Sequence, residues 1–302
     1  MSRWLARPRL GTSFYKAHGL GNDYLVFEEG DGWTAVPSAV VRVCDRYRGV
    51  GSDGIVVLGP RRADGVFPLR MLNPDGSEFE RSGNGLRVLA SHLARTGRGQ
   101  SAFTVEVAGE LVGLTVRDSG SGAYDVSCDM GRARVGPKAV ELDSSALDDD
   151  GRLAGPDGAA LHVVPVNVGN PHLVVLTPEV TEGRLAVLGP FLVAHQALAH
   201  GANVQLARPT GGYACEALIW ERGVGRTSAS GTSSCAVAVA MVHEGRLPAG
   251  DITVRMPGGE LSVTVSKDFD VVLRGPVEEV CTGELAPRLL AELSQAFRSS
   301  PA

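Results

Sequence analysis

Two parts of this chain resemble each other at a constant spacing of 148 residues. The segment at 20–26, Leu-Gly-Asn-Asp-Tyr-Leu-Val, resembles the segment at 168–174, Val-Gly-Asn-Pro-His-Leu-Val. The Ser-Gly pair that begins at Ser82 likewise aligns with the pair that begins at Ser230. Two independent pairs with one offset indicate two copies of one fold, because self-similarity at a fixed spacing marks a repeated structural unit. The alternative is that glycine-rich turns recur by chance in a chain with 39 glycines.

Hydrophobic patterning predicts many short strands and few helices. Short runs rich in β-branched residues and bounded by turn residues predict strands in both halves of the chain. Residues 85–95 carry apolar side chains at i, i+3, i+4 and i+7, which predicts an amphipathic helix. Residues 233–244 are apolar all round and predict a buried helix, and 36–47 and 287–298 are two further predicted helices.

We therefore expect an α+β protein with two pseudo-symmetric domains from an internal duplication, each a mostly antiparallel sheet wrapped around a central helix. The first domain is expected at 1–132 and the second at 133–302, with the final segment as a candidate to return to the first domain. The acidic, glycine-containing stretch at 143–160 predicts a surface insertion.

Composition excludes several classes of protein. The net charge is −5, which argues against a nucleic-acid surface, and the apolar content of 43% argues against disorder. No apolar stretch reaches the roughly 18 residues of a membrane span, and the N-terminus lacks the apolar run of a secretory signal. The five cysteines are scattered without a CxxC motif, which is typical of a reduced compartment. We expect a cytoplasmic protein.

The sequence also lacks the motifs of common cofactors. No histidine pair has the spacing of metal ligands on a helix, so we expect no metal. The glycine-rich stretch at 49–54 lacks the context of a dinucleotide fingerprint, and no phosphate loop is present, so we expect no cofactor.

The two Ser-Gly pairs each precede an apolar helix. Backbone N–H groups at a helix N-terminus bind anions, and two such ends aimed at one point would hold a carboxylate. Stabilising the negative charge that develops on this carboxylate makes its α-carbon more acidic. Ser82 and Ser230 on opposite faces of that carbon would then suit racemisation or epimerisation without a cofactor. The alternative is that both serines only cap their helices, which is a common role of serine.

Five motifs follow one another along the chain: His-Gly-Leu-Gly-Asn-Asp at 18–23, Asn-Pro-Asp-Gly-Ser at 73–77, Gly-Asn-Gly at 83–85, Gly-Asn-Pro-His at 169–172 and Glu-Arg-Gly at 221–223. Through these motifs the chain resembles the diaminopimelate epimerases, a family of cofactor-independent enzymes with a duplicated fold. The resemblance runs from about residue 14 to about residue 283. It implies interconversion of LL- and meso-diaminopimelate, a reaction of bacterial lysine and cell-wall precursor synthesis.

The resemblance also implies a set of site residues. Ser82 and Ser230 stand at the two base positions, and Gly83, Asn84, Gly231 and Thr232 would donate hydrogen bonds to the carboxylate at the reacting centre. Arg222 with Asn73, Asn170 and Asn203 would hold the distal carboxylate, for which an arginine fork is suited. Glu221 would face the distal ammonium, and Asn22 is a further substrate contact. The expected partner is a small amino-acid substrate, with no nucleic acid and no membrane; a homodimer is left open.

The chain departs from the family at both base positions, where the family has cysteine. A serine hydroxyl is a far weaker acid than a thiol, which titrates near pH 8.5. Cys235 lies inside the predicted helix, and we expect a small buried core residue there. A second departure is Arg226, where the family usually has an acidic residue. Three alternatives stay open: a diaminopimelate epimerase that uses serines, a racemase, isomerase or lyase for another amino acid, and an amino-acid-binding homologue without catalysis.

Overall fold

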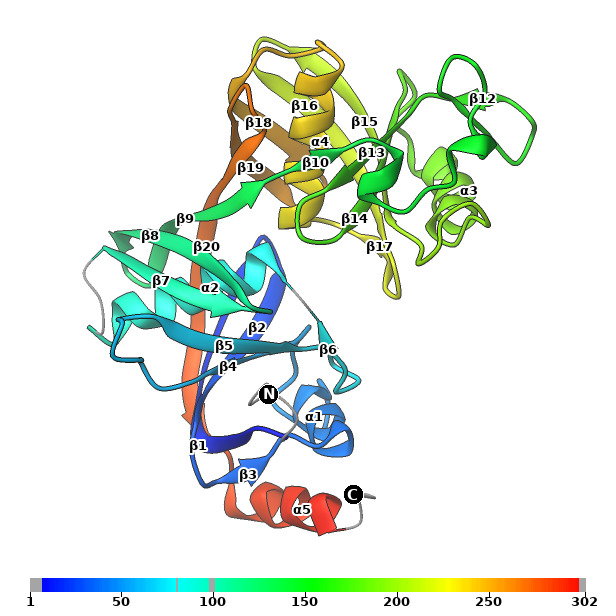
Figure 1. Ribbon diagram of the computed structural model, residues 1–302. Coiled ribbons are helices and arrows are strands. Elements are labelled where there is room, and N and C mark those ends of the chain that lie inside the picture. The colour runs from blue at the N-terminus through cyan, green and yellow to red at the C-terminus, as the bar shows by residue number, and fades with distance from the viewer. Residues whose placement is uncertain (1–6, 80, 98–100, 299–302) are drawn as a thin grey trace. The chain divides into compact units, whose positions relative to one another are not determined.

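The computed structural model describes residues 7–79, 81–97 and 101–298 (Figure 1). The chain divides into two compact units. Unit 1 is Met1–Cys128 together with Pro276–Ala302, and unit 2 is Asp129–Gly275. Unit 2 is thus inserted within the sequence of unit 1. The chain enters unit 2 within strand β9 (Ala123–Arg132) and returns to unit 1 within strand β20 (Asp270–Glu284).

The sheet of unit 1 closes on itself. Its ladder runs β1, β2, β4, β5, β7, β8, β9, β20 and back to β1, so these strands form a barrel in which each has a partner on both sides. The pairs β2–β4 and β5–β7 are parallel, and the other pairs in this ladder with a described register are antiparallel. The strands of this unit besides β9 and β20 are β1 (Arg9–Gly19), β2 (Asn22–Glu29), β3 (Trp33–Thr34), β4 (Ile55–Leu58), β5 (Phe67–Leu72), β6 (Glu78–Phe79), β7 (Ala102–Val107) and β8 (Glu110–Gly120).

The described residues of unit 1 also form the helices α1, α2 and α5. Helix α2 (Gly83–Arg95) contacts β1, β2, β4 and β8, and its residues from the first to Leu93 are buried. Helices α1 (Pro37–Cys44) and α5 (Pro287–Arg298) pack against each other, and α5 also packs on β3 (Figure 1). They cover a separate apolar core that includes Phe27 and Trp33, whose rings meet edge to face.

Unit 2 is built on a similar ladder of strands. Its ladder runs β10, β13, β14, β15, β16, β18, β19 and β20, with β17 paired to β16, and the pairs β14–β15 and β16–β18 are parallel. Its strands are β10 (Arg134–Val135), β11 (Leu153–Ala154), β12 (Ala160–Leu161), β13 (Val163–Asn167), β14 (Pro171–Leu176), β15 (Asn203–Gly211), β16 (Ala214–Glu221), β17 (Gly225–Thr227), β18 (Gly250–Met256) and β19 (Gly259–Val265).

Helices α3 and α4 of unit 2 both pack against strands of this ladder. Helix α4 (Gly231–His243) contacts β13, β14, β15, β16, β18 and β19, and it is buried from Gly231 to Met241. Helix α3 (Glu182–Val193) packs on β15, β16 and β17 over an apolar core of its own. Two short 3₁₀ turns, at Pro137–Ala139 and Ser144–Ala146, precede the small β11–β12 hairpin.

The 148-residue spacing relates whole elements of the two units. Helices α2 and α4 have 13 residues each and begin 148 residues apart, and α1 falls within α3 under the same shift. The two parallel pairs of unit 1 correspond to the two of unit 2. The two units therefore share one order of elements.

The four predicted helices are confirmed, with ends shifted by up to three residues. Helix α3 was not predicted, because Gly183, Gly189 and Pro190 weaken its helix propensity. The prediction of an amphipathic helix at 85–95 is wrong for the polar face. Strands contact more than one face of α2, so Arg87 and Ser91 are buried together with the apolar stripe.

Two further features bear on the expectations from sequence. The stretch 143–160 is mostly exposed, although Leu153 within it joins the core of unit 2. Across the described residues, every helix is too short or too polar to span a membrane.

Candidate active site

Ser82 and Ser230 occupy equivalent positions at the N-termini of α2 and α4. Each has an extended backbone, and each side-chain Oγ accepts a hydrogen bond from the N–H three residues later, at 3.0 Å from Gly85 and 3.4 Å from Ser233. The capping role considered from sequence is therefore present at both helices, where such a bond contributes about 1 kcal/mol. It uses one acceptor site of each hydroxyl, and the O–H of each serine remains a donor.

The first N–H groups of each helix have no carbonyl one turn earlier within the helix. In α2 these belong to Gly83 and Asn84, and in α4 to Gly231 and Thr232. Together with the positive end of the helix dipole, they make each N-terminus a site for negative charge. These four residues are the ones predicted to bind the carboxylate at the reacting centre.

In unit 1 the structure brings Asn22 to the start of α2. Asn22 begins β2 directly after Gly21, whose φ of 85° lies in the left-handed region that glycine favours. The amide Nδ2 of Asn84 donates to the Oδ1 of Asn22 at 2.8 Å, and the Nδ2 of Asn22 donates to the carboxylate of Asp53 at 2.9 Å.

Asn73 has a more local environment. It lies in the turn between β5 and β6, where its Nδ2 donates to the Oγ of Ser77 at 2.9 Å. Its backbone also pairs with Ser77 and with Gly76 across the same turn. The contacts of Asn73 are those of a turn-forming asparagine.

In unit 2 the ends of three neighbouring strands bring Asn170, Asn203 and Arg222 together. The Oδ1 of Asn203 accepts the backbone N–H of Arg222 at 2.9 Å, and its Nδ2 donates to the carbonyl of Pro171 at 3.3 Å. The Nη1 of Arg222 donates to the carbonyl of His200 at 2.7 Å, and Glu221 is the last residue of β16 beside it.

His172, which lies inside a matched loop, and Gln205 orient Asn170. His172 is fully buried, and burial lowers its pKa to about 3, so the imidazole is neutral. Its Nδ1 accepts from Nε2 of Gln205 at 3.0 Å, so its Nε2 carries the proton and donates to the Oδ1 of Asn170 at 2.8 Å. The amide nitrogen of Asn170 is thereby directed away from His172. The one sequence signal was the place of His172 inside a matched loop.

Arg226 forms a bidentate ion pair with the carboxylate of Glu182. Its Nε and Nη2 lie 2.8 and 2.5 Å from the two carboxylate oxygens, and this pairing lowers the pKa of Glu182. Because Glu182 is the first residue of α3, the pair ties the β16–β17 hairpin to that helix.

Cys44, Cys128, Cys215 and Cys235 are buried. Cys235 is fully buried within α4, which confirms the prediction of a core residue. Burial raises the pKa of Cys44 to about 11 and that of Cys215 to about 12, so these two are thiols rather than thiolates near neutral pH.

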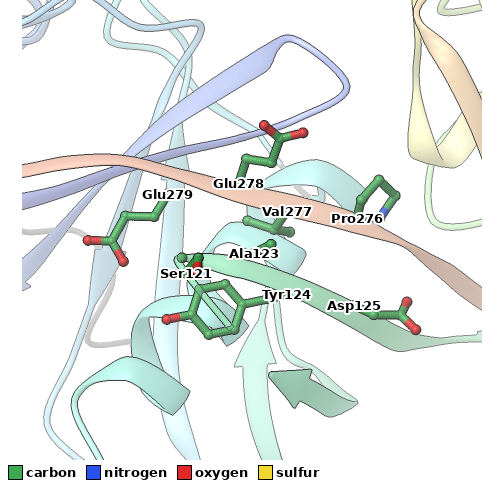
Figure 2. Close-up of a pocket in the computed structure, with 9 residues that line it drawn as sticks. Ser121, Ala123, Tyr124, Asp125, Pro276, Val277, Glu278 and Glu279 are labelled. Atoms are coloured by element: carbon green, nitrogen blue, oxygen red, sulfur yellow. The ribbon is translucent and has the colours of Figure 1, made fainter. Parts of the chain in front are cut away.

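A pocket of about 380 Å³ lies in unit 1, between residues 121–125 and 276–279 (Figure 2). In Figure 2 the carboxylates of Asp125, Glu278 and Glu279 point in different directions, and Glu279 is paired with Arg95 at 3.1 Å. The lining of this pocket contains no residue of the predicted site. Among the described residues, no cluster of three or more His, Cys, Asp or Glu side chains is arranged to hold a metal ion.

Residues 14–136 and 164–280 match the family profile described as diaminopimelate epimerase. The chain belongs to the diaminopimelate epimerase family. A diaminopimelate epimerase from Geobacillus sp. (strain WCH70) is 33% identical over 279 residues, which cover 90% of this chain and 97% of that protein. Another, from Rhodospirillum centenum, is 37% identical over 280 residues, with 92% and 93% covered.

A solved structure shows the same fold as this member of the diaminopimelate epimerase family. It is a predicted epimerase from Pseudomonas aeruginosa, with a TM-score of 0.67 at 21% identity, covering 91% of this chain and 99% of that one. The shared fold has two domains, rich in sheet and with few helices.

Proposed function

We propose that this chain is an isomerase that interconverts LL- and meso-diaminopimelate by removing and returning the proton on the α-carbon, without a cofactor. The observation that carries the proposal is the pair of equivalent helix N-termini. Each is capped by a serine and offers two backbone N–H groups to an anion. Family membership makes diaminopimelate the substrate to test first.

The chemistry follows from these groups. The N–H groups of Gly83, Asn84, Gly231 and Thr232 would bind the α-carboxylate, and they would stabilise the negative charge that it gains when the α-proton leaves. Ser82 on one face of the carbon and Ser230 on the other would pass the proton. Because a serine alkoxide is hard to populate, each serine would need a neighbouring base or would act as a relay.

The distal end of the substrate is assigned to Asn73 and to four polar residues of unit 2, which are Asn170, Asn203, Glu221 and Arg222. Arg222, held by the carbonyl of His200, would bind the distal carboxylate with Asn170 and Asn203. Glu221 would face the distal ammonium. Asn22 is a further substrate contact, and its link to Asn84 supports its place near the reacting centre.

We infer further that each unit is a mostly antiparallel sheet around one central helix. The burial of α2 and α4 and their contacts with several strands support this architecture. A cytoplasmic location and the absence of nucleic-acid and membrane partners remain part of the proposal, and the homodimer remains an open alternative.

A second candidate is a racemase, isomerase or lyase for another amino acid. The observation that favours it is serine at both base positions. An amino-acid-binding homologue without catalysis is the third candidate.

One experiment separates these functions. Purified protein is incubated with LL-diaminopimelate in deuterated water, and the product is analysed for α-deuterium and for the meso isomer. The proposal predicts both α-deuterium and the meso isomer. If no α-hydrogen exchange occurs even at high enzyme concentration, the proposal is refuted. Exchange or elimination with a different amino acid would establish the second candidate, and a ligand-induced rise in melting temperature without any exchange would establish binding alone.

A further inference from the structure

We propose that Arg87 and Asp53 are positioning residues that fix the orientation of the Asn84 and Asn22 side-chain amides. The inference rests on the proposed function, because it concerns how these two asparagines present donors to the substrate. All four residues lie in unit 1.

The four side chains form one hydrogen-bonded series. The Nη2 of Arg87 donates to the Oδ1 of Asn84, the Nδ2 of Asn84 donates to the Oδ1 of Asn22 at 2.8 Å, and the Nδ2 of Asn22 donates to the Oδ2 of Asp53 at 2.9 Å. Arg87 is fully buried and Asn84 nearly so, which makes the series expensive to break.

The two ends of the series decide its direction. A guanidinium can only donate hydrogen bonds and an ionised carboxylate can only accept them. An asparagine amide can turn by 180° and exchange its donor and acceptor sides. With a donor at one end and an acceptor at the other, a turn of either Asn84 or Asn22 would place oxygen against oxygen or nitrogen against nitrogen. Each amide therefore keeps its nitrogen on one side, with a second N–H available for a ligand.

Asp53 is itself held on both oxygens. Its Oδ1 accepts from the Nη2 of Arg46 at 2.6 Å, and its Oδ2 accepts the backbone N–H of Asp23 at 3.2 Å as well as the bond from Asn22. An asparagine at position 53 has one oxygen where the carboxylate has two. It would have to give up either Arg46 or Asn22, and the direction of the series would no longer be fixed.

The equivalent position in unit 2 shows that this series is not required by the fold. The residue 148 positions after Arg87 is Cys235, which has no charge to fix a direction. Asn170, the equivalent of Asn22, is oriented by the neutral His172 instead. The buried guanidinium is thus a feature of unit 1, where it acts on two proposed substrate-binding residues.

The consequence is selectivity for an anion in this part of the site. Asn22 and Asn84 present N–H donors next to the N–H groups of the α2 N-terminus, so a carboxylate is bound and an ammonium is rejected. Loss of the fixed orientation would cost binding and rate without removing either asparagine.

The test uses the full chain and three variants. Asp53→Asn removes the acceptor-only end, Arg87→Gln removes the donor-only end, and Arg87→Lys keeps a donor-only group. Asp45→Asn is the matched control, because Asp45 is a carboxylate of the same loop that caps the N–H groups of Tyr47 and Arg48 outside the series. Each protein is assayed for kcat and KM with LL-diaminopimelate, and for melting temperature.

We expect Asp53→Asn to lower kcat/KM at least tenfold and Asp45→Asn to leave it within twofold. Arg87→Lys should retain more activity than Arg87→Gln, which a role in packing alone would not produce. An active wild type with Asp53→Asn within twofold of the control would overturn the inference.

A second measurement does not depend on turnover. The side-chain amide signals of Asn22 and Asn84 in ¹⁵N NMR should both shift in Asp53→Asn and stay unchanged in Asp45→Asn. If neither signal shifts in Asp53→Asn, the series does not control the amides. If the signals shift as expected but the wild type exchanges no α-hydrogen, the proposed function fails and the positioning of the amides stands.

Discussion

Replacing both Ser82 and Ser230 by cysteine is expected to raise epimerase activity and to lower stability. The thiol has a reference pKa near 8.5, so about a quarter is thiolate at pH 8, and the helix N-terminus raises that fraction. Since a well-placed general base contributes about 10²–10⁴-fold, we expect the double variant to be at least about 100-fold faster than the wild type.

The effect on stability should have the opposite sign. Each serine Oγ accepts the N–H of Gly85 or Ser233, and sulfur is a weak acceptor. Loss of a cap costs about 1 kcal/mol, so two caps cost about 2 kcal/mol. In a protein of this size each kcal/mol lowers the melting temperature by roughly 2–4 °C. A faster but less stable enzyme cannot be explained by better folding.

The assay is α-hydrogen exchange of LL-diaminopimelate in deuterated water at several pH values, together with thermal unfolding. Ser91→Cys serves as the control, because Ser91 is a buried serine of α2 that bonds to Tyr15 at 2.9 Å, away from the helix start. It should lose stability and gain no activity. A folded double variant with an unchanged or lower rate would refute the reasoning and would show that the site uses other chemistry.

Three further predictions concern stability. Burial depresses the pKa of His172 from about 6.5 to about 3, so the contribution of His172 to the free energy of unfolding is present above pH 6.5 and is lost as the pH falls toward 3. In His172→Gln, the urea midpoint should therefore change less with pH over that range. The pKa of Asp23 is lowered although burial raises it, because hydrogen bonds from Arg46 and Lys16 outweigh burial. The contribution of Asp23 to the free energy of unfolding is therefore present above about pH 4 and lost below it. Asp23→Asn should be less stable than the wild type at pH 7 and should lose less of its stability in acid. Gly189→Ala places a Cβ 2.6 Å from the Trp220 ring, and it should destabilise the protein by about 1–3 kcal/mol in thermal unfolding.

Local patterns in the sequence were sufficient to predict most of the helices. The uniformly apolar run at 233–244 predicted a buried helix, and α4 is buried over most of its length. Helix α3 has no such local signal, because Gly189 and Pro190 interrupt it. The duplication would have found it, since α1 shifted by 148 residues falls on 185–192.

The polar contacts of the site could not be predicted from local patterns in the sequence. Arg87 stood on the predicted polar face of its helix, and its burial follows from strands that are distant in sequence. The bond between Asn22 and Asn84 likewise depends on how β2 meets α2. The family motifs indicated which residues matter, His172 among them, whereas the roles of Gln205 and Asp53 became visible only through their hydrogen-bond partners.

The closure of the unit 1 barrel by β20 has a consequence for biosynthesis. Residues 7–128 leave the ribosome before unit 2, and β20, which pairs with both β1 and β9, runs from the end of unit 2 into the part of unit 1 that follows it in the sequence. During translation unit 1 therefore exposes two unpaired strand edges, while unit 2 is made as one continuous segment that can fold first. Unit 1 keeps these edges exposed until the last strand is made, and a ribosome that stalls within unit 2 leaves a product that can aggregate through its unpaired strands.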